Sequence, residues 1–253
     1  MSFKAAADRP IVFAGPSVRA LRPEARRRLD IRAPARRGDL EALRAETRPG
    51  YVLLIDGVFG ASMAATPTEC RHLLEDGWGL WGASSIGALR AAELWSIGMV
   101  GIGEVYLQFR LDPVPSDGDV AVAYHPDSHE ELTVSVVQLR ALARALAIGG
   151  FDAALVDTMF DVGSEIYWCE RTWERLWDAW RSLGSDAARA MEEARAWAAV
   201  PACHPKVRDA NLAVESLLTA IDDVGPSSRD IDALLTRLDH NGGTARWRNN
   251  QSS

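Results

Sequence analysis

Short apolar runs alternate with helix-forming segments over the first hundred residues, and this alternation restricts the fold more than any other feature. The runs at 11–14, 51–55 and 78–81 are typical of strands, and helix signals occupy 38–46 and 66–76 between them. Strands that alternate with helices form βαβ crossovers, in which the strands are parallel. We therefore predict an α/β fold whose Rossmann-like parallel sheet holds these three strands as neighbours.

The predicted helices carry capping signals. Asp39 is expected to be the N-cap of the helix over 38–46. The sequence Thr66-Pro67-Thr68-Glu69 is a capping box with proline at the first helical position, so a helix is expected to begin there and end at Gly77. A further helix is predicted over 88–94, which consists of strong helix formers.

The second half of the chain is predicted to be mostly helical, after one more candidate strand at 117–124. The expected helices lie at 133–148, 152–160, 165–183, 187–199 and 207–221. One helical stripe with the spacing of a core seam holds Ile166, Trp173, Trp177 and Trp180. We expect an α/β core over 10–145, a helical C-terminal layer or subdomain over 146–240, and a flexible tail over 241–253.

The charge is unevenly distributed. With 28 basic and 35 acidic residues the net charge is -7, which disfavours general binding of nucleic acid. Residues 1–50 are the exception, with twelve basic and six acidic side chains, an excess of +6. This basic segment is either a solvated arginine face or a docking site for an acidic partner.

The cysteines and the apolar runs bear on the cellular compartment. Cys70, Cys169 and Cys203 share no close spacing, so neither a zinc site nor a disulfide framework is expected, and all three are predicted to be buried thiols. No signal peptide is recognisable, and no apolar run reaches the roughly 18 residues that span a bilayer. We therefore expect a cytoplasmic protein with no membrane partner.

The three predicted strands are each followed by turn residues suited to ligand binding. The turns are Gly15-Pro16-Ser17, Asp56-Gly57 and Gly82-Ala83-Ser84-Ser85. Open parallel sheets bind ligands beyond the carboxyl ends of their strands, so this edge is the predicted site. The sequence shows no metal-ligand spacing, and Gly98-x-x-Gly101-x-Gly103 follows no convincing strand, so no metal and no nicotinamide or other cofactor is expected.

The turn Gly82-Ala83-Ser84-Ser85-Ile86-Gly87 between a strand and a helix is the clearest chemical signal. Free N–H groups and the positive end of the helix dipole can hold an oxyanion there, and Ser84 or Ser85 can serve as a nucleophile. Alternatively, a serine only caps the helix while the two glycines permit close packing. No residue has the diagnostic spacing of a base, and the candidates are His72, His125, His129, His204 and Lys206.

A series of motifs in fixed order resembles the core of the TfuA family over about residues 10–145. The motifs are Ile11-Val-Phe-Ala-Gly-Pro-Ser17, Pro34-Ala-Arg-Arg-Gly-Asp39, Ile55-Asp-Gly-Val-Phe59, Gly82-Ala-Ser-Ser-Ile-Gly-Ala-Leu-Arg-Ala-Ala-Glu-Leu94 and Gly98-Met-Val-Gly-Ile-Gly103. Members of this family accompany YcaO enzymes, which activate a backbone amide with ATP. The pair is implicated in exchanging amide oxygen for sulfur on ribosomally made peptides or on a methanogenesis enzyme.

The resemblance implies partners and site residues. The implied partners are a YcaO-type ATP-dependent cyclodehydratase-like enzyme, a sulfur carrier protein or other sulfide donor, and a ribosomal precursor peptide. The implied catalytic residues are Ser84, Ser85 and Asp56, and the residues expected to bind substrate or an anion are Gly15, Pro16, Ser17, Gly57, Ala83, Gly87, Arg90 and Arg37. Whether two copies form a homodimer stays open.

The sequence departs from the family pattern at three places. Pro67-Thr68-Glu69 stands where many relatives carry Trp-His-Lys-Glu, Ile86 replaces a frequent methionine, and an acidic run is reduced to Asp117-Gly118-Asp119. These departures leave the serine turn, Asp56 and Arg90 as the residues to which family roles transfer best.

Two functions are compatible with these observations. In the first, the chain is an enzyme that liberates sulfide from an acyl-sulfur donor such as a protein thiocarboxylate. A serine attacks or positions the donor carbonyl, turn N–H groups hold the oxyanion, and Asp56 or a histidine manages the proton. In the second, it is a non-catalytic adaptor that recruits or regulates the YcaO enzyme, the donor or the substrate peptide.

Overall fold

The computed structural model describes residues 9–60, 63–112 and 116–224, which contain a five-stranded sheet. The strands are β1 (Ile11–Phe13), β2 (Asp30–Arg32), β3 (Tyr51–Leu54), β4 (Gly79–Ala83) and β5 (Val100–Ile102). They lie in the order β2-β1-β3-β4-β5, and every neighbouring pair is parallel. The predicted α/β class and the parallel pairing of β1, β3 and β4 are therefore confirmed.

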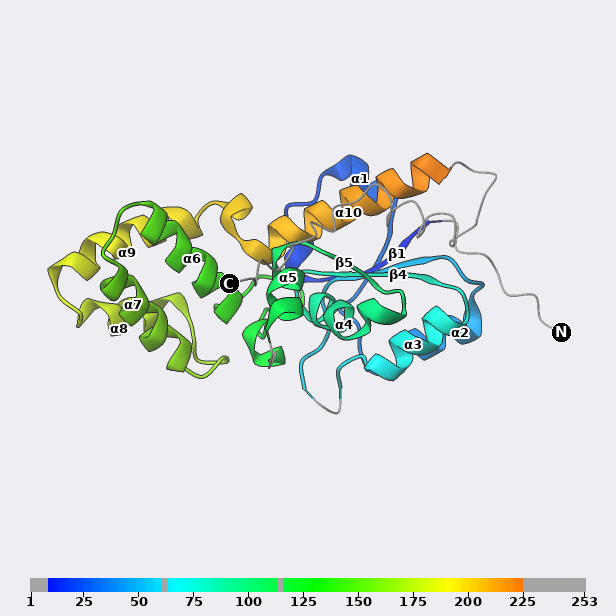
Figure 1. The fold of residues 1–253 in the computed structure, drawn as a ribbon, viewed down its shortest axis with the longest axis horizontal. Coiled ribbons are helices and arrows are strands. Elements are labelled where there is room, and N and C mark those ends of the chain that lie inside the picture. Colours follow the sequence, from blue (N-terminus) through cyan, green and yellow to red (C-terminus); the bar gives the residue numbers. More distant parts are fainter. Residues whose placement is uncertain (1–8, 61–62, 113–115, 225–253) are drawn as a thin grey trace, which may run out of the picture.

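Helices cover both faces of the sheet (Figure 1). One face carries α2 (Asp39–Glu46), α3 (Pro67–Glu75), α4 (Ile86–Leu94) and α5 (Glu104–Leu111), and the opposite face carries α1 (Pro23–Arg27) and α10 (Pro205–Val224). Successive strand residues point to opposite faces, so a strand covered on both sides must be apolar throughout. β3 shows this directly, because Val52 and Leu54 belong to one core and Leu53 to the other.

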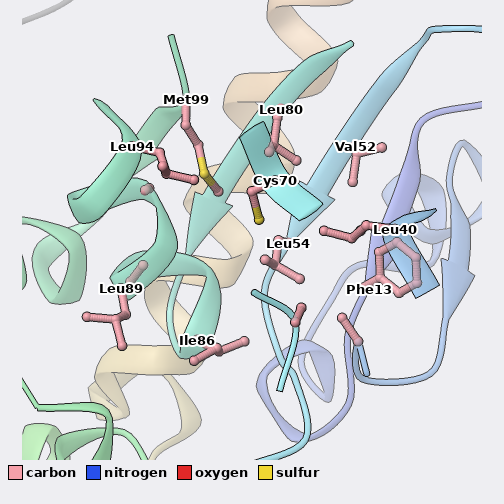
Figure 2. Packing of buried hydrophobic residues seen from close by; sticks show 14 of the residues in the cluster. Phe13, Leu40, Val52, Leu54, Cys70, Leu80, Ile86, Leu89, Leu94 and Met99 are labelled. Atoms are coloured by element: carbon pink, nitrogen blue, oxygen red, sulfur yellow. The ribbon is translucent and has the colours of Figure 1, made fainter. Parts of the chain in front are cut away.

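The core under α2–α4 is built from aliphatic side chains of the strands and helices. Figure 2 shows Phe13, Leu54 and Leu80 of the sheet among Leu40 of α2 and Ile86 of α4, and all five are buried. Full burial of a side chain of this size stabilises the fold by roughly 1.5–3 kcal/mol. The helices are thereby fixed on the sheet, and with them the turns that connect strand to helix.

Four further helices form a lobe beside the sheet (Figure 1). They are α6 (Val136–Ile148), α7 (Ala153–Glu165), α8 (Trp173–Arg181) and α9 (Ser185–Ala198), and they share a core of their own. α10 then returns to the sheet, so the helical second half is divided between a lobe and a sheet-covering layer. No helix in the described part of the chain combines the length and apolar character needed to cross a bilayer. The tail expected at 241–253 lies outside the described residues.

One predicted strand is wrong, and one strand was not predicted. The unpredicted strand is β5, which lies within the glycine cluster 98–103 and is easily missed because it has three residues, one of them Gly101. The segment 117–124 forms no strand beyond an isolated bridge of Tyr124 to Glu131. A 3₁₀ turn over Asp117–Asp119 takes its place, since Asp and Gly favour turns and the Ser116 hydroxyl accepts from the Gly118 N–H.

The single helix predicted over 165–183 is also wrong, because it is interrupted before α8. The buried Arg171 guanidinium donates to the carbonyls of Gly163 and Ser164, which ends α7, and Thr172 caps α8. Ile166 therefore lies outside the α8 helix, although it packs with the same tryptophans in the core of the lobe.

Two smaller expectations need correction. The N-cap of α2 is Gly38 at φ +95°, and Asp39 is the first helical residue, whose carboxylate accepts from the Arg36 N–H. The capping box of α3 is present as predicted. Of the cysteines only Cys70 is buried; Cys203 is half-buried and Cys169 is exposed in the α7–α8 connection.

Candidate functional site

The turns that follow β1, β3 and β4 meet at one edge of the sheet and form a pocket. Its cavity volume is about 40 Å³, enough for a small group. The lining residues are Pro16, Asp56, Gly57, Val58, Phe59, Ser85, Ile86, Val120, Ala121, Val122 and Tyr124. The chain crosses over β1 on its way from β2 to β3, so the strand order reverses between β1 and β3. Such a switch point is where open α/β sheets bind ligands.

Asp56 joins the turns after β1 and β3. Its Oδ1 accepts from the Ser17 hydroxyl at 2.7 Å, and its Oδ2 accepts from the N–H groups of Gly15 at 2.8 Å and Ser17 at 3.1 Å. The carboxylate is 5% exposed and lines the pocket. These three bonds fix the switch point, so Asp56 combines a structural task with its place in the pocket.

Ser84 occupies a strained position between β4 and α4. Its φ is +67°, and the Ser85 N–H donates to the Ala83 carbonyl at 2.8 Å, which closes a γ-turn around it. The Ser84 hydroxyl is fully buried and donates to the Lys206 carbonyl at 2.8 Å. Ser84 therefore faces α10 rather than the pocket.

Ser85 is the serine that faces the pocket. It is the N-cap of α4, and its hydroxyl makes no hydrogen bond to any residue that the structure describes. The Gly87 N–H donates a hydrogen bond to the Ile55 carbonyl at 3.2 Å, whereas the Ile86 N–H makes no backbone hydrogen bond within the described residues. A free hydroxyl beside a free amide at a helix N-terminus is suited to a nucleophile and an oxyanion donor.

Glycines allow these elements to approach closely. A Cβ at Gly87 would overlap the Leu54 carbonyl, and one at Gly82 would overlap the Gly87 carbonyl. A Cβ at Gly57 would lie 2.6 Å from Ile86 Cγ2, and one at Gly15 would lie 2.7 Å from Pro34 Cγ. The packing role that we considered for Gly82 and Gly87 is thus real, and it coexists with the open Ser85.

Tyr124 closes the pocket from a hairpin-like segment, 123–133, that sequence reasoning did not connect with the site. Burial raises the pKa of the Tyr124 phenol, the Asp56 carboxylate adds to this, and Arg36 opposes it. The phenol therefore stays protonated at neutral pH and can donate a hydrogen bond. The aromatic ring of Trp168, from the α7–α8 connection, lies 5.2 Å from the Phe59 ring at the same pocket.

Two predicted anion-binding arginines lie away from the pocket lining. Arg90 donates to the Ala65 carbonyl at 2.9 Å and to Glu93 at 2.5 Å, which ties α4 to the start of α3. Arg37 is exposed on the turn before α2, where its N–H donates to the Met63 carbonyl. Of the other predicted residues, Ala83 ends β4, while Pro16 and Gly57 line the pocket.

The candidate bases are scattered. His72 pairs with Glu41 on α2 at 2.5 Å, and the imidazole of His129 packs on the ring of Tyr124, 6.0 Å away. In the turn of the same hairpin, His125 Nδ1 accepts from the N–H groups of Asp127 and Ser128. None of the three lines the pocket in the described structure.

His204 and Lys206 lie together behind the serine turn, in a buried charge cluster with Glu131 and Arg19. Sequence reasoning named the first two residues and missed the other two. The only available signal was the rarity of lysine, since the chain has two lysines among its basic residues.

A comparison with protein families matches part of the chain. The family model described as TfuA-like protein matches residues 56–172, a segment that contains Asp56, the serine turn and the Tyr124 hairpin. β1, β3 and α10 lie outside the matched segment. No curated protein matches the chain. The family match confirms the resemblance that the sequence motifs indicated, and it assigns residues 56–172 of this chain to the TfuA-like family.

Proposed function

We propose that the chain acts with a YcaO enzyme in backbone thioamidation of a ribosomal peptide or a protein, and that it releases sulfide from a thiocarboxylated donor at the switch-point pocket. The observation that carries the proposal is the orientation of the two serines. The γ-turn buries Ser84 against α10 and leaves Ser85 in the pocket with a free hydroxyl. Strained backbone of this kind is concentrated at functional sites.

The proposed reaction has two steps. The Ser85 oxygen attacks the thiocarboxylate carbon, and the tetrahedral oxyanion is held by the Ile86 N–H and the Tyr124 hydroxyl. Asp56 passes the proton taken from Ser85 to the sulfur, the C–S bond breaks and HS⁻ leaves, while the donor acyl group stays on Ser85 as an ester. Water hydrolyses this ester to a carboxylate and restores the serine. The sum is RCOS⁻ + H₂O → RCOO⁻ + HS⁻ + H⁺.

Asp56 is the proposed acceptor for the serine proton. It is the acidic residue that lines the pocket, whereas His72, His125 and His129 do not. Its hydrogen bonds from Gly15 and Ser17 hold the carboxylate in place at the edge of the pocket.

The test is sulfide release from a thiocarboxylated carrier protein by the purified chain without its YcaO partner. Ser85→Ala should lower kcat by a factor of about 100 or more, which corresponds to at least about 2.7 kcal/mol of transition-state stabilisation. Ser84→Ala is the matched control. It also removes a serine hydroxyl, but from the neighbouring residue, whose hydroxyl is bonded to α10 and does not face the pocket. No release by the wild type, or equal release by both variants, would contradict the proposal.

One observation favours the adaptor function instead. Both oxygens of Asp56 already serve the loop after β1, and the Ser84 hydroxyl serves α10, so much of the polar chemistry of this edge is structural. An adaptor would support thioamidation by the YcaO enzyme even as Ser85→Ala. Binding and thioamidation assays with that variant therefore separate the two functions.

A further inference from the structure

A cluster of four ionisable side chains, three of them buried, lies behind the serine turn, with Glu131 at its centre. Glu131 Oε2 lies 3.0 Å from Arg19 Nη1 and 2.8 Å from His204 Nε2, and Oε1 lies 2.8 Å from Lys206 Nζ. The side chains of Lys206, His204 and Glu131 are 1%, 5% and 9% exposed. Arg19 is the one member that reaches solvent.

The charges of the cluster are set by burial and by each other. Burial acts to raise the pKa of the Glu131 carboxyl, but the facing Lys206 and, after it, His204 outweigh burial and hold that pKa well below its usual range. Burial lowers the pKa of His204 although Glu131 opposes this, so the imidazole is neutral at pH 7. One carboxylate therefore compensates two cations, Lys206 and Arg19.

Two members of the cluster, Arg19 and Lys206, contact walls of the pocket. Arg19 Nη1 donates to the Pro16 carbonyl and Lys206 Nζ to the Val120 carbonyl, both at 3.4 Å, and Pro16 and Val120 line the pocket. The Lys206 carbonyl accepts the Ser84 hydroxyl at 2.8 Å, which holds the turn that presents Ser85.

Glu131 also belongs to the hairpin that closes the pocket. Its backbone forms the antiparallel bridge with Tyr124, and the Ala123 carbonyl accepts from the Leu132 N–H at 2.8 Å. The side chain of Glu131 thus holds the Tyr124 arm against the start of α10. Three segments far apart in the sequence, around residues 19, 131 and 204–206, therefore meet at this carboxylate.

We propose that Glu131 is the positioning residue of the pocket: by pairing with Lys206 and Arg19 it sets the distance between the serine turn, the Val120 wall and Tyr124. The expected effect of Glu131 on kcat rests on the proposed sulfide release, whereas its effect on the position of the pocket walls does not. Stability alone does not account for such a cluster, because a buried ion pair can often be replaced by apolar side chains at no cost.

The test compares Glu131→Gln with the double variant Glu131→Gln/Lys206→Met. The single variant leaves Lys206 buried without its carboxylate and should lower the melting temperature, while the double variant removes that unpaired charge and should melt near the wild type. If Glu131 positions the pocket, the double variant still has a kcat at least about tenfold lower, with little change in KM. Recovery of wild-type kcat in the folded double variant would overturn the inference.

A second readout does not depend on sulfide. Amide hydrogen exchange of the double variant should be at least about tenfold faster in peptides covering 84–89 and 116–124, and unchanged over α6. Unchanged exchange in both peptides overturns the inference even if the wild type releases sulfide. If the wild type releases none, the proposed function fails while the exchange result still decides the role of Glu131.

A single variant, Lys206→Met, can replace the double variant in the exchange measurement. Should the double variant not fold, Lys206→Met alone leaves Glu131 paired with Arg19 and removes the contact to Val120. Faster exchange is then expected over 116–124. Its absence would contradict the inference.

Discussion

Neighbouring residues of one turn perform different tasks in this protein. Ser84 takes the positive φ and gives its hydroxyl to α10, and Ser85 thereby faces the pocket with its own hydroxyl free. The sequence predicts the serine turn but offers no way to choose between the two serines. The choice depends on the Lys206 carbonyl, more than a hundred residues away, which no local pattern reveals.

Asp209 gives the fold a pH dependence that can be measured. Burial raises the pKa of its carboxyl to about 6, against the bond from the Val105 N–H at 2.7 Å. The folded protein therefore holds this proton more tightly than the unfolded chain, whose Asp pKa is about 4. The contribution of protonated Asp209 to the unfolding free energy is fully present below about pH 4 and is lost as the pH rises through about 6. Roughly 1 kcal/mol of it is lost between pH 5 and 7.5.

Asp209→Asn keeps an oxygen acceptor for the Val105 N–H and removes the titrating carboxyl. Between pH 5 and 7.5 the unfolding free energy of this variant should therefore change by roughly 1 kcal/mol less than that of the wild type. Urea titrations at both pH values measure this. Asp222→Asn is the control on the same helix, because Arg28 lowers the pKa of Asp222 and its titration falls below this range. Equal slopes for wild type and Asp209→Asn would contradict the account.

At the scale of elements, the sequence predicted what local chemistry determines. The capping box of α3 and the strands β1, β3 and β4 were predicted because apolar runs and caps are local signals. β2 and β5 were missed, since both are edge strands without an apolar run: β2 is Asp-Ile-Arg and β5 is Val-Gly-Ile. The break before α8 was missed because it depends on Arg171, whose guanidinium reaches back to the carbonyls that end α7.

The capping box is expected to stabilise α3 measurably. The Thr66 hydroxyl accepts from the Glu69 N–H at 3.2 Å, and Glu69 also accepts from the Gly38 N–H at the start of α2. Thr66→Ala should cost about 1 kcal/mol of unfolding free energy, measured with urea. Thr68→Ala, at an exposed position of the same helix, is the control and should change it by less than about 0.5 kcal/mol. Equal costs for the two variants would show that the cap does not contribute.

At the scale of the molecule, the sheet order brings distant segments to one pocket. The switch point between β1 and β3 collects the turns after β1, β3 and β4, and the segment 120–124 completes the pocket. The helix α10 supports the pocket by accepting a hydrogen bond from Ser84 in the serine turn. The sequence predicted the edge of the sheet from its strand-end turns. It could not predict Tyr124 or Glu131, because their position depends on how the hairpin returns to the sheet.

The basic first fifty residues are either a solvated arginine face or a docking site for an acidic partner, and a charge reversal can distinguish the two. Arg36 and Arg37 are exposed at the pocket edge of the sheet, whereas Arg48 is exposed at the opposite edge, just before β3. If an acidic partner docks here, Arg36→Glu/Arg37→Glu should weaken binding of the YcaO enzyme at low salt, and the difference should shrink at high salt, where screening removes the attraction. Calorimetry at two salt concentrations measures this.

The single variant Arg48→Glu is the control for a charge reversal at the opposite edge of the sheet. It should leave the affinity near that of the wild type. Unchanged affinity of the double variant at low salt would show that Arg36 and Arg37 belong to a solvated face and not to a docking site.

Trapping of the acyl group tests the central claim most directly. A thiocarboxylated carrier would be mixed with the wild type, quenched in acid within one turnover, digested and analysed by mass spectrometry. The account predicts the carrier's terminal acyl group as an ester on Ser85, present in Ser84→Ala and absent in Ser85→Ala. An acyl group on another residue, or sulfide release by Ser85→Ala at the wild-type rate, would contradict it.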